Sequence, residues 1–107
     1  MKINEAAEQA GLSKRAVKYY EEQGLLHIKK DPNGYRNYTP EDVQTLKEIS
    51  AYRKLGIGIS DIRDLLAGTN KALLDRIYEE KKNLFRENQK ELEALQRFIS
   101  DKNVDTL

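Results

Sequence analysis

Basic and aromatic side chains gather between positions 12 and 38 of this sequence. The cations of that stretch are Lys14, Arg15, Lys18, Lys29, Lys30 and Arg36. Ammonium and guanidinium groups form charge-assisted hydrogen bonds with phosphate oxygens, and tyrosine hydroxyls can add neutral ones. The first three cations fall in the segment SKRAVKYYEEQG and the others in LLHIKKDPNGYRNY. If both segments reach one surface, that surface can bind a polyanion.

The overall composition makes this basic character local. The 107 residues include 19 Lys and Arg against 18 Asp and Glu, so the net charge is only +1. Between positions 12 and 38, six basic residues outnumber three acidic ones, Glu21, Glu22 and Asp31. Bulk charge therefore does not account for binding to a nucleic acid, whereas a local basic patch does.

The elements expected around these residues form a helix-turn-helix. A first helix is expected to begin after Asn4, its N-cap, with alanines on its apolar side. Gly11 ends this helix, and Ser13 caps the next one. Two short helices separated by a tight turn that contains Gly are typical of a helix-turn-helix.

The second helix carries its charges in an order that does not stabilise it. Val17 and Tyr20 can pack against the first helix. The side chains left to face solvent or a ligand are Lys14, Arg15, Lys18 and Tyr19. Cations at the helix start and the carboxylates of Glu21 and Glu22 at its end oppose the helix dipole, whereas phosphate at the start is favoured. This order favours a ligand-binding face over the alternative, a merely solvated one.

A β-hairpin is expected next, with an apolar strand at 25–28, a turn at 31–34 and a return strand at 35–38. Its tip is rigid because proline and glycine fix the turn. The cations beside that tip are Lys29, Lys30 and Arg36. They suit a wing that rests on a phosphate backbone. His27 is expected to be exposed on this ribbon, without a second His or Cys to build a metal site with it.

Two further helices are expected to complete this head, which would span residues 1–69. Thr39 is the N-cap of the third helix, Pro40 takes its first position and Asp42 completes a capping box. That helix ends at Leu55-Gly56. A short fourth helix is expected to begin with Ser60 as its cap and to end at a glycine. Both helices are predicted to be structural.

Residues 70–101 contain neither Gly nor Pro and predict one helix of about 45 Å. Its apolar stripe consists of Leu74, Ile77, Leu84, Leu92, Leu95 and Ile99. A stripe this long and narrow needs a partner, and a second copy can bury it in a coiled coil. Lys81 and Asn88 interrupt it: either both lie at its edge, or Asn88 pairs across the dimer and fixes the register. Residues 102–107 are expected to be a tail or a truncated linker.

Three motifs, in this order, resemble the signatures of the MerR family of bacterial transcription regulators. They are Lys18-Tyr19-Tyr20-Glu21-Glu22-x-Gly24-Leu25-Leu26, Asn33-Gly34-Tyr35-Arg36-x-Tyr38, and Leu55-Gly56-Ile57 followed by Ile62-x-x-Leu65-Leu66. The resemblance implies a mainly α fold. It consists of a winged helix-turn-helix head with a small β-hairpin wing, a supporting helical pair, and a long helix that forms an antiparallel coiled coil in a homodimer.

The resemblance also implies roles for single residues. The base readers on the recognition helix would be Lys14, Arg15 and Lys18. The phosphate contacts would come from Ser13, Tyr19, Lys29, Lys30, Arg36 and Tyr38. Lys18 departs from the family, which more often has arginine there, and lysine reads guanine less specifically. Tyr35 is expected to pack the wing against the head.

A regulator of this family binds a dyad in double-stranded promoter DNA and distorts an over-long spacer, so that RNA polymerase can engage both promoter elements. Whether this protein activates or represses stays open. The chain has no cysteine for the metal or redox sensing found in the family. No metal ion or cofactor is therefore expected, and the effector is unknown. Either the protein is a minimal member, or a sensor domain after the coiled coil has been removed.

Two other classes of protein are less compatible with this sequence. An adaptor that binds an acidic protein would use the same cations. Its binding would depend only weakly on salt, and it would show no preference for a DNA sequence. An enzyme is disfavoured because the sequence has no metal-ligand cluster, nucleophile motif or phosphate loop and only one histidine. No signal peptide or long apolar run directs the chain to a membrane, so a cytoplasmic location is expected.

Overall fold

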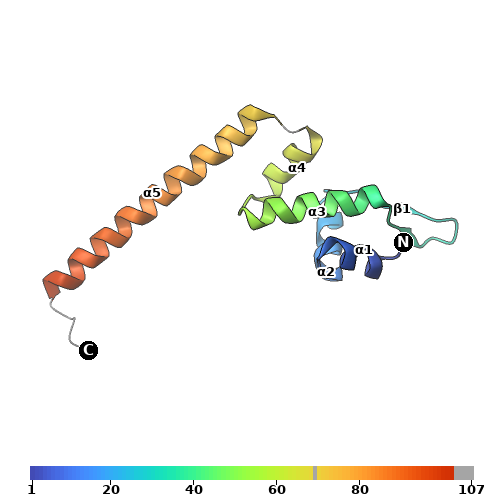
Figure 1. Ribbon diagram of the computed structural model, residues 1–107, viewed down its shortest axis with the longest axis horizontal. Coiled ribbons are helices and arrows are strands. Elements are labelled where there is room, and N and C mark those ends of the chain that lie inside the picture. The colour runs from blue at the N-terminus through green and yellow to red at the C-terminus, as the bar shows by residue number, and fades with distance from the viewer. Residues whose placement is uncertain (69, 103–107) are drawn as a thin grey trace. The chain divides into compact units, whose positions relative to one another are not determined.

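The computed structural model describes residues 1–68 and 70–102 (Figure 1). The chain divides into two units, Met1–Thr69 and Asn70–Leu107. The first unit contains α1 (Ile3–Ala10), α2 (Lys14–Glu22), β1 (Lys29–Lys30), β2 (Arg36–Asn37), α3 (Pro40–Lys54) and α4 (Ile59–Ala67), and the second contains α5 (Lys71–Lys102). This order of helices around one small hairpin, followed by a long helix, confirms the predicted mainly α fold.

The turn between α1 and α2 is built from local interactions. Gly11 ends α1 with a φ of 71°, a left-handed conformation that glycine adopts without strain. The N–H of Leu12 then donates to the carbonyl of Ala7 at 2.9 Å. The hydroxyl oxygen of Ser13 accepts a hydrogen bond from the N–H of Ala16 at 3.0 Å, which confirms Ser13 as the N-cap of α2.

The wing is smaller than the sequence indicated. Its register places Lys29 opposite Asn37 and Lys30 opposite Arg36. The turn is organised by Asp31, whose carboxylate accepts hydrogen bonds from the N–H groups of Asn33 and Tyr35, both at 3.0 Å. Leu25 and Leu26, which were expected to begin the first strand, are buried in the core before β1 begins. The apolar run that predicted a strand therefore contributes its two leucines to the core instead.

The core of the first unit collects apolar side chains from its helices and from the end of the wing. The largest fully buried side chains are Val17, Tyr38, Leu46, Ile49, Ile62 and Leu65. The predicted capping box of α3 is present: Thr39 Oγ1 accepts from the N–H of Asp42 at 3.1 Å, and the Asp42 carboxylate accepts from the N–H of Thr39 at 2.9 Å. Arg63 of α4 donates to the carbonyl of Gln23 at 2.6 Å and so holds α4 against the end of α2.

Two predicted helix starts were wrong. α1 begins at Ile3, so Asn4 lies inside its first turn, and α4 begins at Ile59, so Ser60 lies inside the helix. Neither helix has a side-chain cap. Before α1, the backbone of Met1 is bound to Tyr38, whose N–H donates to the Met1 carbonyl at 2.8 Å. This long-range contact, rather than a local cap, fixes where α1 starts.

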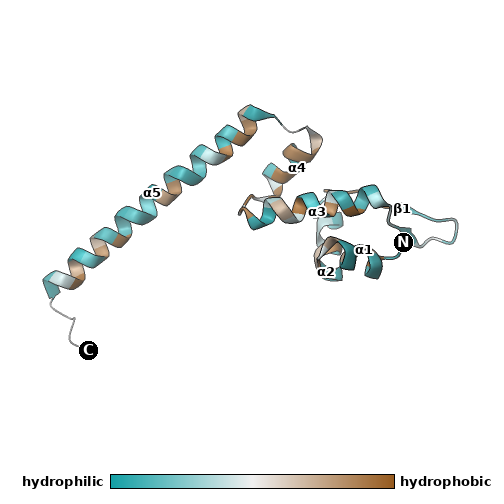
Figure 2. Ribbon diagram, viewed as in Figure 1, coloured by the Kyte–Doolittle hydropathy of each residue, from teal (hydrophilic) through white to brown (hydrophobic). Residues whose placement is uncertain are grey.

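α5 is one uninterrupted helix over 32 residues. Asn70 caps its start, because the side-chain oxygen accepts a hydrogen bond from the N–H of Leu73 at 2.7 Å. The helix ends at Lys102, one residue later than predicted. Residues 103–107 of the expected tail lie outside the described residues. Figure 2 shows hydrophobic segments recurring along α5 between hydrophilic ones.

Candidate nucleic-acid interface

The exposed face of α2 carries the cations that the sequence analysis selected. Lys14, Arg15 and Lys18 are all exposed, whereas Val17 and Tyr20 of the same helix are buried. Within the described part of the chain, none of the three cations takes part in an ion pair. These side chains are therefore available to a ligand, and the buried side of α2 fixes the direction in which they project.

Ser13 and Tyr19 lie at the two ends of this face. The hydroxyl oxygen of Ser13 is used as a helix cap, but its hydrogen remains available to a phosphate. The ring of Tyr19 packs edge-to-face on buried Tyr20, with 5.7 Å between the ring centroids. This contact holds the Tyr19 phenol at the surface, where it stays partly exposed.

The wing is joined to α2 by an ion pair that the sequence did not reveal. Arg36 Nε lies 2.8 Å from Glu21 Oε1, and the side chains are 51% and 20% exposed. The hydrogen bond to Glu21, and then its negative charge, raise the pKa of the Arg36 guanidinium above its ordinary value. The Nε of Arg36 is therefore already engaged by Glu21.

A cleft of about 560 Å³ lies between the start of α1, α2 and the wing. Its cations are Lys2, Lys18 and Arg36, and its carboxylates are those of Glu21 and Glu22. Lys29 and Lys30 are also exposed on the wing. The structure therefore brings one cation of each predicted group, Lys18 of α2 and Arg36 of the wing, to the same cleft. Lys2 belongs with them and was not selected from the sequence, because it lies outside the motifs.

The two tyrosines of the wing exchange their expected surroundings. Tyr35 is 67% exposed and does not pack the wing against the head, so that expectation was wrong. Tyr38 is only 1% exposed, and its hydroxyl oxygen is buried with no hydrogen-bond partner in the described residues. Burial, followed by the charge of Glu21, raises the pKa of Tyr38. In this conformation the hydroxyl of Tyr38 is not presented to a phosphate.

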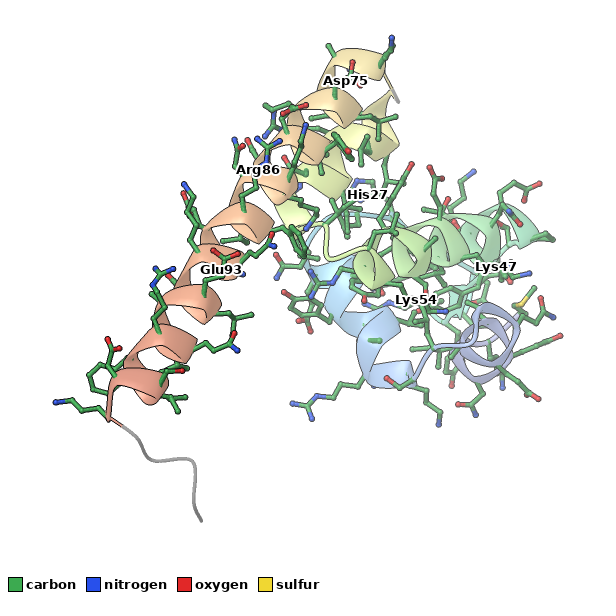
Figure 3. The ribbon with its side chains drawn as sticks, turned by 60° about the vertical axis from the view of Figure 1, so that its left-hand side comes forward. His27, Lys47, Lys54, Asp75, Arg86 and Glu93 are labelled. Atoms are coloured by element: carbon green, nitrogen blue, oxygen red, sulfur yellow. The ribbon has the colours of Figure 1, made fainter. Side chains whose placement is uncertain are left out.

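His27 precedes β1 and is exposed, as expected (labelled in Figure 3). No group of three or more His, Cys, Asp or Glu side chains suited to a metal ion occurs among residues 1–68 and 70–102. Across the same residues, no helix combines the length and the apolar character needed to cross a bilayer.

α5 presents a second surface that is suited to a partner. Ile77 of the predicted stripe is buried, whereas Leu74, Leu84, Leu92, Leu95 and Ile99 are exposed, as is Asn88. Three exposed aromatic side chains extend the stripe and were missed because they fall one position outside the selected spacing. They are Tyr78, Phe85 and Phe98. So many large apolar side chains exposed on one helix indicate an interface.

Comparisons with known proteins bear on both units. Residues 1–69 match the model described as MerR HTH family regulatory protein. The HTH-type transcriptional regulator HmrR of Rhizobium leguminosarum bv. viciae is 40% identical over 67 residues, which are 63% of this chain and 52% of that protein. The chain thus spans about half the length of the curated relatives it matches.

Two solved structures have a similar fold. The transcription regulator PbrR691 from Ralstonia metallidurans CH34, in complex with lead(II), is 27% identical with a TM-score of 0.79. That similarity covers 94% of this chain and 83% of the other. HiNmlR, described as a MerR family regulator lacking the sensor domain and bound to promoter DNA, is 22% identical with a TM-score of 0.61. This second similarity covers 94% of this chain and 78% of HiNmlR.

Proposed function

Because this chain belongs to the MerR HTH family of regulatory proteins, we propose that it binds a dyad in promoter DNA as a homodimer and regulates transcription there. The family consists of regulators and not of enzymes. The observation that carries the proposal is that Lys18 of the exposed α2 face and Arg36 of the wing line one cleft. An adaptor for acidic proteins would not need a rigid helix and a wing set at two neighbouring positions.

On α2, we assign base reading to Lys14, Arg15 and Lys18. Arg15 is the strongest reader because its planar guanidinium can donate two hydrogen bonds to guanine in the major groove. Lys18 also lines the cleft beside the wing. Its ammonium is a point charge without that fork, so it contributes more to grip than to discrimination.

The phosphate contacts in this proposal come from both segments. They are Ser13, Tyr19, Lys29, Lys30 and Arg36. Tyr38 joins them only if DNA binding moves the wing, because its hydroxyl is buried. Three of these residues in each head are cations, so a dimer would neutralise six phosphates. Counterion release then gives a slope of about −5 in a plot of log affinity against log salt.

We assign dimerisation to α5. The exposed members of the predicted stripe, widened by the three aromatic residues, would be buried against a second copy in an antiparallel coiled coil, whereas Ile77 is already buried in the single chain. These exposed members are Leu74, Leu84, Asn88, Leu92, Leu95 and Ile99. Burying about half of a leucine surface contributes on the order of 1 kcal/mol. The arrangement would place two heads on two half-sites.

Two bound heads can distort the DNA between them. Smooth bending of a site of this kind costs about 1–6 kcal/mol, which contacts on both half-sites must offset. Such distortion would let RNA polymerase engage an over-long promoter spacer, and the same dimer on a normally spaced promoter would block it. The protein would act in the cytoplasm.

The test is a footprint of the protein on DNA from upstream of its own gene, repeated over a salt series. We expect a protected dyad between promoter elements, enhanced cleavage at its centre and a steep fall of affinity with salt. Arg15→Ala should lose preference for that dyad. Lys47→Ala, which removes an exposed cation from α3 (labelled in Figure 3), should leave the footprint unchanged. The absence of any protected site at low salt would contradict the proposal.

A further inference from the structure

Two carboxylates lie where neither folding nor DNA binding favours them. Glu21 and Glu22 end α2, at the negative end of the helix dipole. Both also line the cleft between α2 and the wing, beside the surface proposed to bind a polyanion. An acidic side chain in that position repels phosphate. A compensating role is therefore needed for at least one of them.

The geometry separates the two carboxylates. Glu21 is four-fifths buried and accepts a hydrogen bond from Arg36 Nε at 2.8 Å, across fifteen residues of sequence. Glu22 is exposed and, in the described part of the chain, forms no ion pair. The two residues share a helix, a charge and a cleft. They differ in their contact with the wing.

This contact fixes a side chain that would otherwise be mobile. Arg36 stands on a strand of only two residues and is half exposed, so its long side chain has many rotamers available. Ordering such a side chain when a partner binds costs conformational entropy. Glu21 holds the guanidinium by Nε alone, which leaves the two terminal amino groups to donate to a phosphate.

We infer that Glu21 is a positioning residue for DNA binding, which orients Arg36 toward the phosphate backbone and holds the wing at a fixed place beside the recognition helix. This inference rests on the proposed function. Because Arg36 is 51% exposed, solvent screens its ion pair with Glu21, and the pair adds little to the stability of the fold. The benefit of the Glu21 carboxylate is therefore realised when DNA binds, where an oriented guanidinium outweighs the repulsion of one carboxylate.

For Glu21→Ala, the change in DNA affinity expected from a positioning role is opposite in sign to the change expected from charge alone. Loss of a carboxylate beside a polyanion should tighten binding, and we expect Glu22→Ala to leave affinity unchanged or to raise it up to about twofold. Glu21→Ala removes the same charge from the same helix but releases Arg36. It should weaken binding about three- to tenfold, whereas Arg36→Ala, which removes the cation itself, should also make the salt slope shallower by about one per head.

The experiment measures affinity for the protected dyad over a salt series, for the full chain and its variants. Glu21→Gln removes the charge but keeps an oxygen that can accept from Nε, so it should bind more tightly than Glu21→Ala. In the Arg36→Ala background, Glu21→Ala should no longer weaken binding and should act as Glu22→Ala does. Thermal unfolding of each variant checks that α2 remains folded, which is expected because alanine is a good helix former.

The outcomes distinguish this inference from the proposed function. If the wild-type chain protects no site, the proposed function fails and the inference with it. If the wild type protects a dyad but Glu21→Ala binds as Glu22→Ala does in both backgrounds, only the positioning role is wrong. It is also wrong if Glu21→Ala abolishes the discrimination that depends on Arg15, because the carboxylate would then act through the fold of α2.

Discussion

Truncation of Leu95 should weaken the dimer that α5 is proposed to form. Leu95 is 54% exposed in the single chain, so about half of its surface remains to be buried by a partner. Full burial of a leucine side chain contributes about 1.5–3 kcal/mol, and half of that is on the order of 1 kcal/mol per copy. Since a homodimer carries the residue twice, Leu95→Ala should cost about 2 kcal/mol, or about thirtyfold in the dissociation constant.

Sedimentation equilibrium over a dilution series measures this dissociation constant directly. Arg86→Ala is the matched control, because nine residues advance a helix by about two and a half turns and place Arg86 opposite Leu95 (Arg86 is labelled in Figure 3). The control should dissociate like the wild type. Alanine raises helix propensity, so unfolding of α5 does not explain a loss of association. The assignment of α5 as the dimer interface would be refuted if both substitutions changed the dissociation constant equally. It would also be refuted if the wild-type protein were a monomer at every concentration.

Four further predictions follow from the same structure. Arg15→Ala should reduce discrimination between the dyad and unrelated DNA by about 1–3 kcal/mol, whereas Arg36→Ala should weaken binding to all sequences about equally; competition footprints measure both. Tyr38→Phe should raise the free energy of unfolding by about 1 kcal/mol, since it removes a buried hydroxyl without a partner, and weaker DNA binding by this variant would mean instead that a phosphate reaches it. Thr39→Ala should lower the free energy of unfolding by about 1 kcal/mol through loss of the α3 cap, measured by denaturant titration. Asn88→Leu should strengthen association but allow more than one register, detected by disulfide cross-linking between introduced cysteines; a single register as in the wild type would place Asn88 at the edge of the seam.

The parts of the fold that the sequence predicted correctly depend on interactions within a few residues. Ser13 caps α2 through Ala16, and Thr39 and Asp42 form their box over three residues. Such contacts can be inferred from residue type and spacing alone. The start of α1 was missed because it depends on Met1 bonding to Tyr38, which is distant in sequence and has no local pattern.

The sequence predicted which residues the candidate site contains, but not which of them contact one another. Exposure of the α2 cations follows from helical periodicity, because Val17 and Tyr20 determine the buried face. In the wing, alternation predicts that neighbouring residues face opposite sides without saying which side is inward. The roles of both tyrosines were taken from the family resemblance, and alternation alone could not have shown that Tyr35 is exposed and Tyr38 buried. The pair between Glu21 and Arg36 was missed for a related reason, since only the folded wing brings position 36 to the end of α2.

In the proposed mode of binding, the head and α5 make separable contributions to DNA affinity. With a net charge of +1, the chain has little general attraction to DNA, and each head offers only a few phosphate-binding cations. In this mode a single head would bind weakly, and the cost of bending would be offset only when both half-sites are occupied. It follows that Leu95→Ala should weaken DNA binding when the protein concentration is below the raised dissociation constant of its dimer. At concentrations well above that constant, the variant should bind like the wild type. The defect of Glu21→Ala should persist at every concentration, because it lies within each head.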